Sequence, residues 1–169
     1  FRDCSSLTSV SIGNSVKTIG DRAFSKCSSL TAINVSIYNP NYASFKGVLF
    51  DKTLTTLIQY PGGYSDSYTI PNNVTSIVNY AFYDCTSLVS VTLGNIVKSI
   101  GISAFENCTS LTSVLFTGNK PSVGNYAFNS TLASIYYFPN TDGWGATFAG
   151  RPTKLFPLSY ESVNQQITV

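Results

Sequence analysis

The stretch LTSVSIGNSVKTIGDRAF (7–24) decides the fold, because closely similar stretches recur along the chain. They are LVSVTLGNIVKSIGISAF (88–105) and LTSVLFTGNKPSVGNYAF (111–128). Aligned on the Phe that follows Ala in the later units, the units begin at Phe1, Phe24, Phe82, Phe105 and Phe128, with spacings of 23, 58, 23 and 23 residues. The register resumes at SYTIPNNVTSIVNYAF (67–82), so the long interval is predicted to be one unit with a 35-residue insertion.

One unit has the composition of a single coil of a β solenoid. Apolar and polar residues alternate over 9–12, which predicts a strand with one buried face. Gly13-Asn14 predicts a turn, 16–19 a second short extended piece, and Ala23-Phe24 a corner. A lone coil cannot bury its apolar side, whereas stacked coils can. We therefore expect about five stacked coils of 23 residues, predominantly β with short turns or 3₁₀ pieces, whose equivalent phenylalanines lie on one another: Phe24, Phe82, Phe105 and Phe128.

The insertion, about 36–66, is predicted to form its own β-hairpin. Residues 48–50 form one apolar strand and 54–60 the other, with Asp51-Lys52 near the turn and Pro61-Gly62-Gly63 at the end.

The last unit, about 128–156, departs from the pattern after Tyr137, as terminal coils of repeat proteins do. Asp142-Gly143-Trp144 predicts one short helical turn that places Trp144 over the end of the core. Residues 157–169 no longer fit the repeat and are expected to be a tail or the start of a following module. Since the chain also begins at a corner without a cap, we expect a piece of a longer repeat protein.

The composition argues against several classes of function. The chain has no histidine, which removes the commonest general base, and it has no nucleophile elbow or glycine-rich phosphate loop. Its ten Lys and Arg residues are scattered, so nothing predicts nucleic-acid binding, and no stretch is long and apolar enough to cross a membrane. Nothing in the sequence predicts a metal or cofactor. We expect no enzymatic activity.

The four cysteines occupy one equivalent position in four units: Cys4, Cys27, Cys85 and Cys108. Zinc sites require clustered ligands, which one cysteine per coil does not supply. Stacked coils about 4.8 Å apart lie within the reach of a disulfide, but side chains in such a row point in parallel rather than toward one another. We expect four free, buried thiols, with disulfides as the alternative.

Two groups of residues are candidates for binding. Leu115 and Tyr136 are the apolar and aromatic members of an outward face that is otherwise mainly small and hydroxylic, although irregular end coils would give the same pattern. The second group comprises tyrosines of the insertion and its flank, where packing around the hairpin is the alternative: Tyr38, Tyr42, Tyr60, Tyr64 and Tyr68.

The repeat pattern AFxxCxSLxSVxLGNxVxxIGxxAF resembles the BspA-like leucine-rich repeats of bacterial and protozoan surface proteins. The resemblance covers residues 1–156, including the insertion and the closing GWGATFAGRPTKLF (143–156). It implies a leucine-rich repeat solenoid displayed outside the cell. We therefore expect a non-enzymatic protein-binding or adhesion module, extracellular or on the cell surface, with a protein partner such as host matrix or another surface protein. A structural spacer in a larger extracellular assembly is the alternative.

Overall fold

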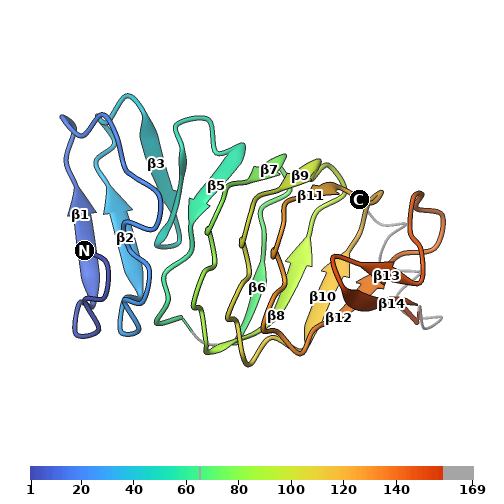
Figure 1. Cartoon of the computed structure of the whole chain (residues 1–169). Coiled ribbons are helices and arrows are strands. Elements are labelled where there is room, and N and C mark those ends of the chain that lie inside the picture. Colours follow the sequence, from blue (N-terminus) through green and yellow to red (C-terminus); the bar gives the residue numbers. More distant parts are fainter. Residues whose placement is uncertain (65, 158–169) are drawn as a thin grey trace.

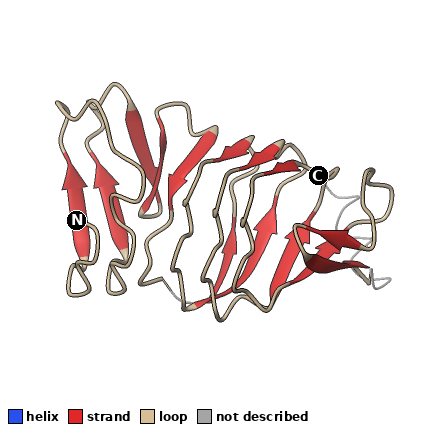
Figure 2. Ribbon diagram, in the orientation of Figure 1, coloured by secondary structure: helices blue, strands red, loops and turns tan. Residues whose placement is uncertain are grey.

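The computed structural model describes residues 1–64 and 66–157 and shows a β solenoid, as predicted. The coils lie side by side from the N-terminal to the C-terminal end of the array (Figure 1). The described residues contain no helix, so strands and turns build every coil (Figure 2). The helical turn predicted at Asp142-Gly143-Trp144 is wrong, since these residues form an irregular loop.

Three sheets run along the array. The first is a pair of parallel strands, β1 (Ser9–Ile12) and β2 (Ala32–Val35). The second has the order β13-β14-β12-β10-β8-β6, with these bounds: β6 Asp66–Thr69, β8 Leu88–Leu93, β10 Ser113–Phe116, β12 Ser134–Tyr137, β13 Thr147–Phe148 and β14 Arg151–Leu155. The third has the order β11-β9-β7-β5-β4-β3, with these bounds: β3 Tyr42–Phe45, β4 Val48–Asp51, β5 Thr56–Gln59, β7 Ser76–Ile77, β9 Ser99–Ile100 and β11 Ser122–Val123.

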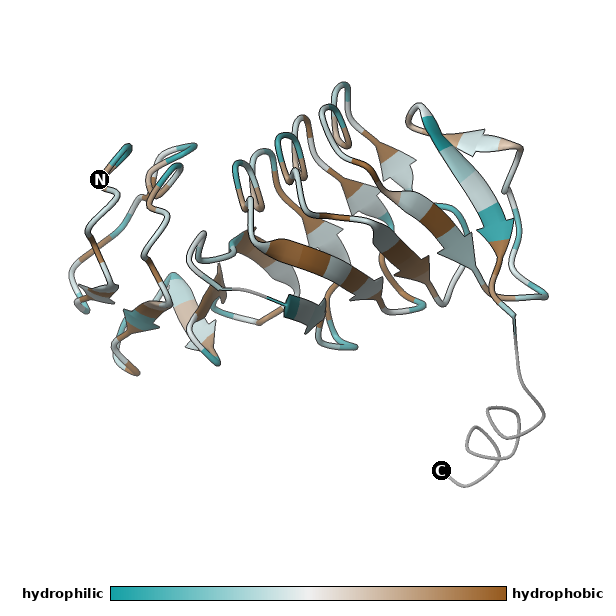
Figure 3. Cartoon of the chain, turned by 90° about the horizontal axis from the view of Figure 1, so that it is seen from below, coloured by the Kyte–Doolittle hydropathy of each residue, from teal (hydrophilic) through white to brown (hydrophobic). Residues whose placement is uncertain are grey.

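Parallel pairing brings equivalent residues of successive coils together. Val91 of β8 lies opposite Val114 of β10, 23 residues later, and Val114 lies opposite Ile135 of β12. All three side chains are buried, while the serines that precede them face outward in part. Figure 3 shows the resulting apolar bands crossing neighbouring strands. Stacking thus buries an apolar face that a single coil would leave in water.

The buried aromatic rings form a row that differs from the prediction at one point. Phe82, Phe105 and Phe128 stack with centroid separations of 4.5 and 5.0 Å. Phe24 instead stacks on Phe1 at 6.0 Å, and Tyr60 takes the next place in the row, 4.9 Å from Phe82. Tyr60 lies 36 residues after Phe24 and 22 before Phe82. The long interval therefore contains an additional coil with Tyr in place of Phe.

The insertion is a three-stranded antiparallel unit rather than a simple hairpin. The predicted strands correspond to β4 and β5, and β3 adds a third strand that the sequence analysis missed. The two-residue turn Lys46-Gly47 joins β3 to β4 with φ angles of 50° and 76°, the combination typical of a type I′ turn. β5 then pairs in parallel with β7, which returns the chain to the solenoid.

The Lys46-Gly47 turn separates β2 from β6, the strands of consecutive coils. Ile33 of β2 donates its N–H to the carbonyl of Gly47 at 2.8 Å, and the Val35 N–H is donated to Ser44 Oγ at 3.0 Å. The buried residues accordingly form two clusters, a small one around Phe24 and a larger one that begins in the insertion and extends to β13.

Two polar side chains make contacts between coils, Asn39 beside the small cluster and Arg22 between the two clusters. Asn39 is fully buried, and its Nδ2 donates to the carbonyls of Gly13 and Val16 at 2.8 and 3.0 Å. The Arg22 guanidinium lies 3.8 Å from the centroid of the Tyr80 ring, a cation–π contact between the two clusters. The contact of Arg22 with Tyr80 compensates in part for the missing β2–β6 ladder.

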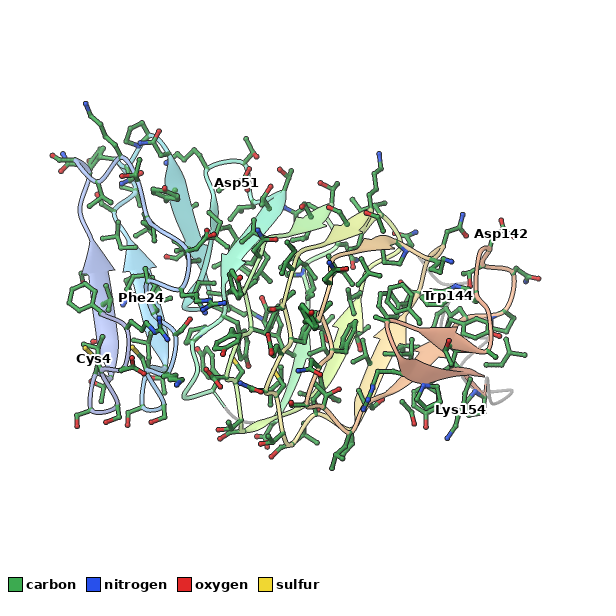
Figure 4. The ribbon with its side chains drawn as sticks, viewed as in Figure 1. Cys4, Phe24, Asp51, Asp142, Trp144 and Lys154 are labelled. Carbon is green, nitrogen blue, oxygen red and sulfur yellow. The ribbon has the colours of Figure 1, made fainter. Side chains whose placement is uncertain are left out.

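The C-terminal end is closed by a second hairpin. β13 and β14 are antiparallel, and β14 also pairs in parallel with β12. Trp144 packs against Tyr137 at 5.1 Å and against Phe116 at 4.9 Å, so it covers the end of the core as predicted (Figure 4). Apart from Pro157, the predicted tail 157–169 lies outside the described residues.

Tight coil spacing predicts a position-dependent effect of a single methyl group. A Cβ at Gly101 would lie 2.4 Å from the backbone nitrogen of Asn79 in the preceding coil, whereas the equivalent Gly20 has nothing within 4 Å. We expect Gly101→Ala to lower the free energy of unfolding by about 1–3 kcal/mol. Gly20→Ala is the matched control and should leave it unchanged or raise it by up to about 1 kcal/mol. Urea denaturation measures both, and equal effects would contradict this account of coil spacing.

Candidate binding surface

Along the second sheet, one outward row of side chains changes from hydroxylic to apolar, aromatic and cationic. Its members lie opposite one another in successive strands: Thr69 of β6, Thr92 of β8, Leu115 of β10, Tyr136 of β12 and Lys154 of β14. The neighbouring row is uniformly serine, and Ser90 donates to Ser67 Oγ at 2.7 Å. The sheet therefore presents hydroxyls at its β6 side and an apolar, aromatic and cationic group at its β14 side.

The two sequence-predicted residues of this row are brought together by the structure. Leu115 and Tyr136 are in register and both are partly exposed, and Lys154 beside them is exposed. The ring of Phe156 meets Tyr136 edge-on at 6.3 Å and also contacts Phe138 at 5.6 Å. We call Leu115, Tyr136, Lys154 and Phe156 the end patch. Phe156 was missed in the sequence because it follows β14, a strand of the closing hairpin that the repeat pattern does not predict.

A shallow polar groove follows the carboxyl ends of the same strands. It has a volume of about 300 Å³ and is lined by Asn72, Asn95, Thr117 and Phe138. Phe138 belongs to the groove and also packs on Phe156 of the end patch. The groove and the end patch therefore adjoin, which gives one continuous surface with apolar and hydrogen-bonding parts.

The five tyrosines singled out in the sequence do not form one surface. Tyr38 is 78% exposed, and Tyr42 packs against the small cluster while its hydroxyl accepts the Ile19 N–H at 3.0 Å. Tyr60, Tyr64 and Tyr68 gather at the larger cluster, with Tyr60 centred 5.6 Å from Tyr64 and 4.8 Å from Tyr68.

The placement of Tyr60 corrects the expectation that it contributes to a binding surface. Its side chain is 2% exposed, because it fills the aromatic row between the insertion and Phe82. Burial raises the pKa of the Tyr60 and Tyr68 hydroxyls well above the ordinary value for tyrosine. Tyr60 is therefore a core residue, in agreement with the alternative that the tyrosines pack around the hairpin.

The cysteines are free thiols, three of them buried. Cys27, Cys85 and Cys108 are enclosed, and the Sγ of Cys108 donates to the Phe82 carbonyl of the preceding coil at 3.0 Å. Burial raises the pKa of the Cys27 thiol. Cys4 is exposed in this chain, which corrects the expectation of four buried thiols.

Two carboxylates at coil corners have polar or charged partners. Asp3 lies at a corner with Arg2 and Lys26 at 3.4 and 3.9 Å, and Asp84 accepts from Asn107 Nδ2 at 3.0 Å. Within residues 1–64 and 66–157, no group of three or more potential metal ligands is present. The same ranges contain no helix of the length and apolarity needed to cross a membrane.

Comparison with known proteins identifies the family. The chain matches the BspA type leucine rich repeat region in six copies, over residues 1–66 and 60–148. It therefore belongs to this family of leucine-rich repeat proteins. The curated proteins contain no match.

Three solved structures of bacterial proteins have a similar fold. The pneumococcal vaccine antigen PcpA matches at 26% identity with a TM-score of 0.66, over 78% of this chain and 39% of that one. A leucine rich cell surface protein from Faecalibacterium prausnitzii matches at 25% and 0.59, over 94% of this chain and 50% of that one. A leucine-rich repeat protein from Eubacterium ventriosum matches at 26% identity with a TM-score of 0.55, over 79% of this chain and 43% of that one. The chain thus aligns with at most half the length of these three proteins.

Thiol reactivity tests the placement of the cysteines. In the native protein we expect an aromatic disulfide reagent to modify only Cys4 quickly, because the other three thiols are enclosed by neighbouring coils. The absorbance of the released thiolate should correspond to one reactive thiol per chain in the native protein and to four per chain in denaturant. Rapid modification of all four without denaturant would contradict the stacked structure, and a Cys4→Ser variant identifies the reactive residue.

Replacement of Tyr60 tests its place in the aromatic row. Since the equivalent residues of the following coils are Phe, Tyr60→Phe should change the free energy of unfolding by less than about 1.5 kcal/mol. Tyr60→Ala should lower it by about 3–5 kcal/mol through the cavity it leaves. Thermal and chemical denaturation give both values. A Tyr60→Ala variant as stable as wild type would show that the ring is not part of the core.

Proposed function

We propose that this chain is a protein-binding module of a cell-surface or secreted protein, with a role in adhesion, and that the end patch makes the contact. The observation that carries the proposal is the change along one row of the second sheet, from Thr69 and Thr92 to Leu115, Tyr136 and Lys154. Aromatic side chains such as Tyr136 and its neighbour Phe156 are enriched in the energetically important parts of protein interfaces.

The geometry of the end patch supports this role. Tyr136 is held by Phe156 from one side and by its strand neighbours from the other, so little side-chain entropy remains to be lost on binding. The adjoining groove offers the amides of Asn72 and Asn95 and the hydroxyl of Thr117 for hydrogen bonds around an apolar centre. Apolar centre and polar rim together match the anatomy of a protein interface.

A position outside the cell is supported by two independent features. Two of the similar structures are described as a vaccine antigen and a cell surface protein. The chain itself has only 11% charged residues and is rich in Ser and Thr, a composition that suits a β-rich extracellular protein better than a cytosolic enzyme.

A structural spacer is the second candidate, and it is favoured by the serine rows. Ser67 and Ser90 hydrogen-bond to one another at 2.7 Å, so part of the face satisfies its own polar groups and offers few unpaired ones to a partner. In this role the solenoid would set a distance between other parts of a surface protein. Neither candidate role involves a catalytic step, and the chain contains no histidine.

A binding screen with a double variant separates the two candidates. The whole chain is tested by surface plasmon resonance against immobilised extracellular matrix proteins, with Leu115→Ser/Tyr136→Ser beside it. For any partner that wild type binds, we expect the double variant to raise Kd by about tenfold or more, a loss of roughly 1.4 kcal/mol or more.

The matched control is Thr69→Ser/Thr92→Ser, which alters the same row on the β6 side and should leave Kd unchanged. Equal binding by both double variants would remove the end patch from the interface. Wild type that binds none of the matrix proteins would favour the spacer.

A further inference from the structure

The turn that divides the solenoid leaves a pocket beside β6. The pocket has a volume of about 280 Å³, and it is lined by Lys46, Tyr60, Tyr64, Asp66, Ser67 and Tyr68. Lys46 comes from the turn that separates β2 from β6, and its carbonyl accepts a hydrogen bond from the Tyr64 hydroxyl at 3.1 Å. The pocket therefore lies at the interruption of the coil stack, where an uninterrupted array would have paired strands.

β6 ends its sheet on the side of this interruption. The order of the described strands terminates at β6, whose paired neighbour is β8. The N–H of Ile70 is donated to the Thr92 carbonyl of β8 at 2.9 Å. Backbone groups of successive residues in a strand point to opposite sides, so those of Tyr68 and Ile70 turn toward β8. The N–H and C=O of Thr69 therefore point away from β8, to the side on which the sheet ends.

An open strand edge is the template for pairing with another extended chain. The described chain covers this edge only in part, because the Lys46-Gly47 turn bonds to Ile33 of β2 and not to β6. The backbone groups of Thr69 thus offer one donor and one acceptor to a partner.

The pocket itself fits one side chain. Its volume of about 280 Å³ is large enough to hold one side chain of a partner. Its walls are the rings of Tyr64 and Tyr68, and the Tyr68 hydroxyl is buried without a hydrogen-bond partner among the described residues. The rings of Tyr64 and Tyr68 offer aromatic contact to an inserted apolar or aromatic side chain.

The mouth of the pocket carries one charge of each sign, Lys46 and Asp66, both exposed. Asp66 has a φ of 81°, a strained value for a residue with a side chain, at the point where the β6–β8 register shifts. A ligand with an acidic residue toward Lys46 and a basic residue toward Asp66 would complement both charges. Such alternation is a property of a peptide rather than of a neutral sugar.

We propose that β6 and the tyrosine pocket form a second binding site, which takes an extended peptide segment of a partner protein by strand addition. The peptide pairs with the free backbone groups of Thr69 and places one apolar or aromatic side chain between Tyr64 and Tyr68. This site is separate from the end patch and does not depend on its role.

Amide hydrogen exchange tests the open edge in the protein without ligand. The Thr69 amide should exchange at least about tenfold faster than the amides of Tyr68 and Ile70, whose groups face β8. Two-dimensional NMR of the whole chain resolves the three amides. Thr69 protected as strongly as its neighbours would show that the edge is already paired and would overturn the proposal.

A random dodecapeptide library displayed on phage then supplies the probe. Peptides enriched on the immobilised whole chain are synthesised and titrated against wild type, Thr69→Pro and Thr69→Val. Proline removes the one N–H the peptide needs while the bonds of Tyr68 and Ile70 to β8 remain, and proline is tolerated on edge strands with that orientation. We expect Thr69→Pro to raise Kd by about tenfold and Thr69→Val to leave it unchanged.

A second variant, Tyr64→Ser, tests the same site if Thr69→Pro does not fold. Tyr64→Ser opens one wall of the pocket and should also raise Kd by about tenfold, while bound peptide should slow exchange of the Thr69 amide in wild type. No enriched peptide, equal binding to Thr69→Pro and Thr69→Val, or unchanged Thr69 exchange in the complex would overturn the proposal. A glycan array that gives Tyr64-dependent binding without protection of Thr69 would assign the pocket to carbohydrate instead.

Discussion

Backbone hydrogen bonding between coils 23 residues apart is the interaction on which this structure depends. Once Ser90, Ser113 and Ser134 lie in register, every other position of the coil is fixed, including which side chains are buried. The spacing leaves so little room that Gly101 meets the backbone of Asn79 directly. Repetition in the sequence therefore has a physical cause: each coil must present to the next the same backbone path and the same buried face.

The insertion shows what happens where this pairing is interrupted. Its Lys46-Gly47 turn occupies the hydrogen-bonding groups of β2, so β6 begins a new sheet and the buried residues form two clusters. Tyr60 continues the aromatic row from the insertion side, while Arg22 connects the two parts by its cation–π contact with Tyr80. An interruption of this kind creates binding features that a regular array lacks, namely an open strand edge and a pocket beside it.

Features that repeat from coil to coil could be predicted from the sequence. Features that depend on a departure from the repeat could not. The alternation over 9–12 and the stacked Phe82, Phe105 and Phe128 follow from periodicity alone, as does the in-register position of Leu115 and Tyr136. Tyr60 was misjudged because it differs in type and spacing from the phenylalanines it continues. Cys4 is exposed in this chain although its three equivalents are buried, and the contact of Phe156 with Tyr136 depends on how the end closes; neither is encoded in the repeat.

The most direct test of this account is the pattern of nuclear Overhauser effects around β2 in the isotopically labelled chain. The central claim is that the turn of the insertion, and not β6, lies beside β2. Cross-strand contacts should therefore connect the Ile33 amide to Gly47, as the 2.8 Å hydrogen bond requires, and none should connect β2 to β6. Contacts between Ala32–Val35 and Asp66–Thr69 of the kind seen between β8 and β10 would show an uninterrupted sheet and contradict the account.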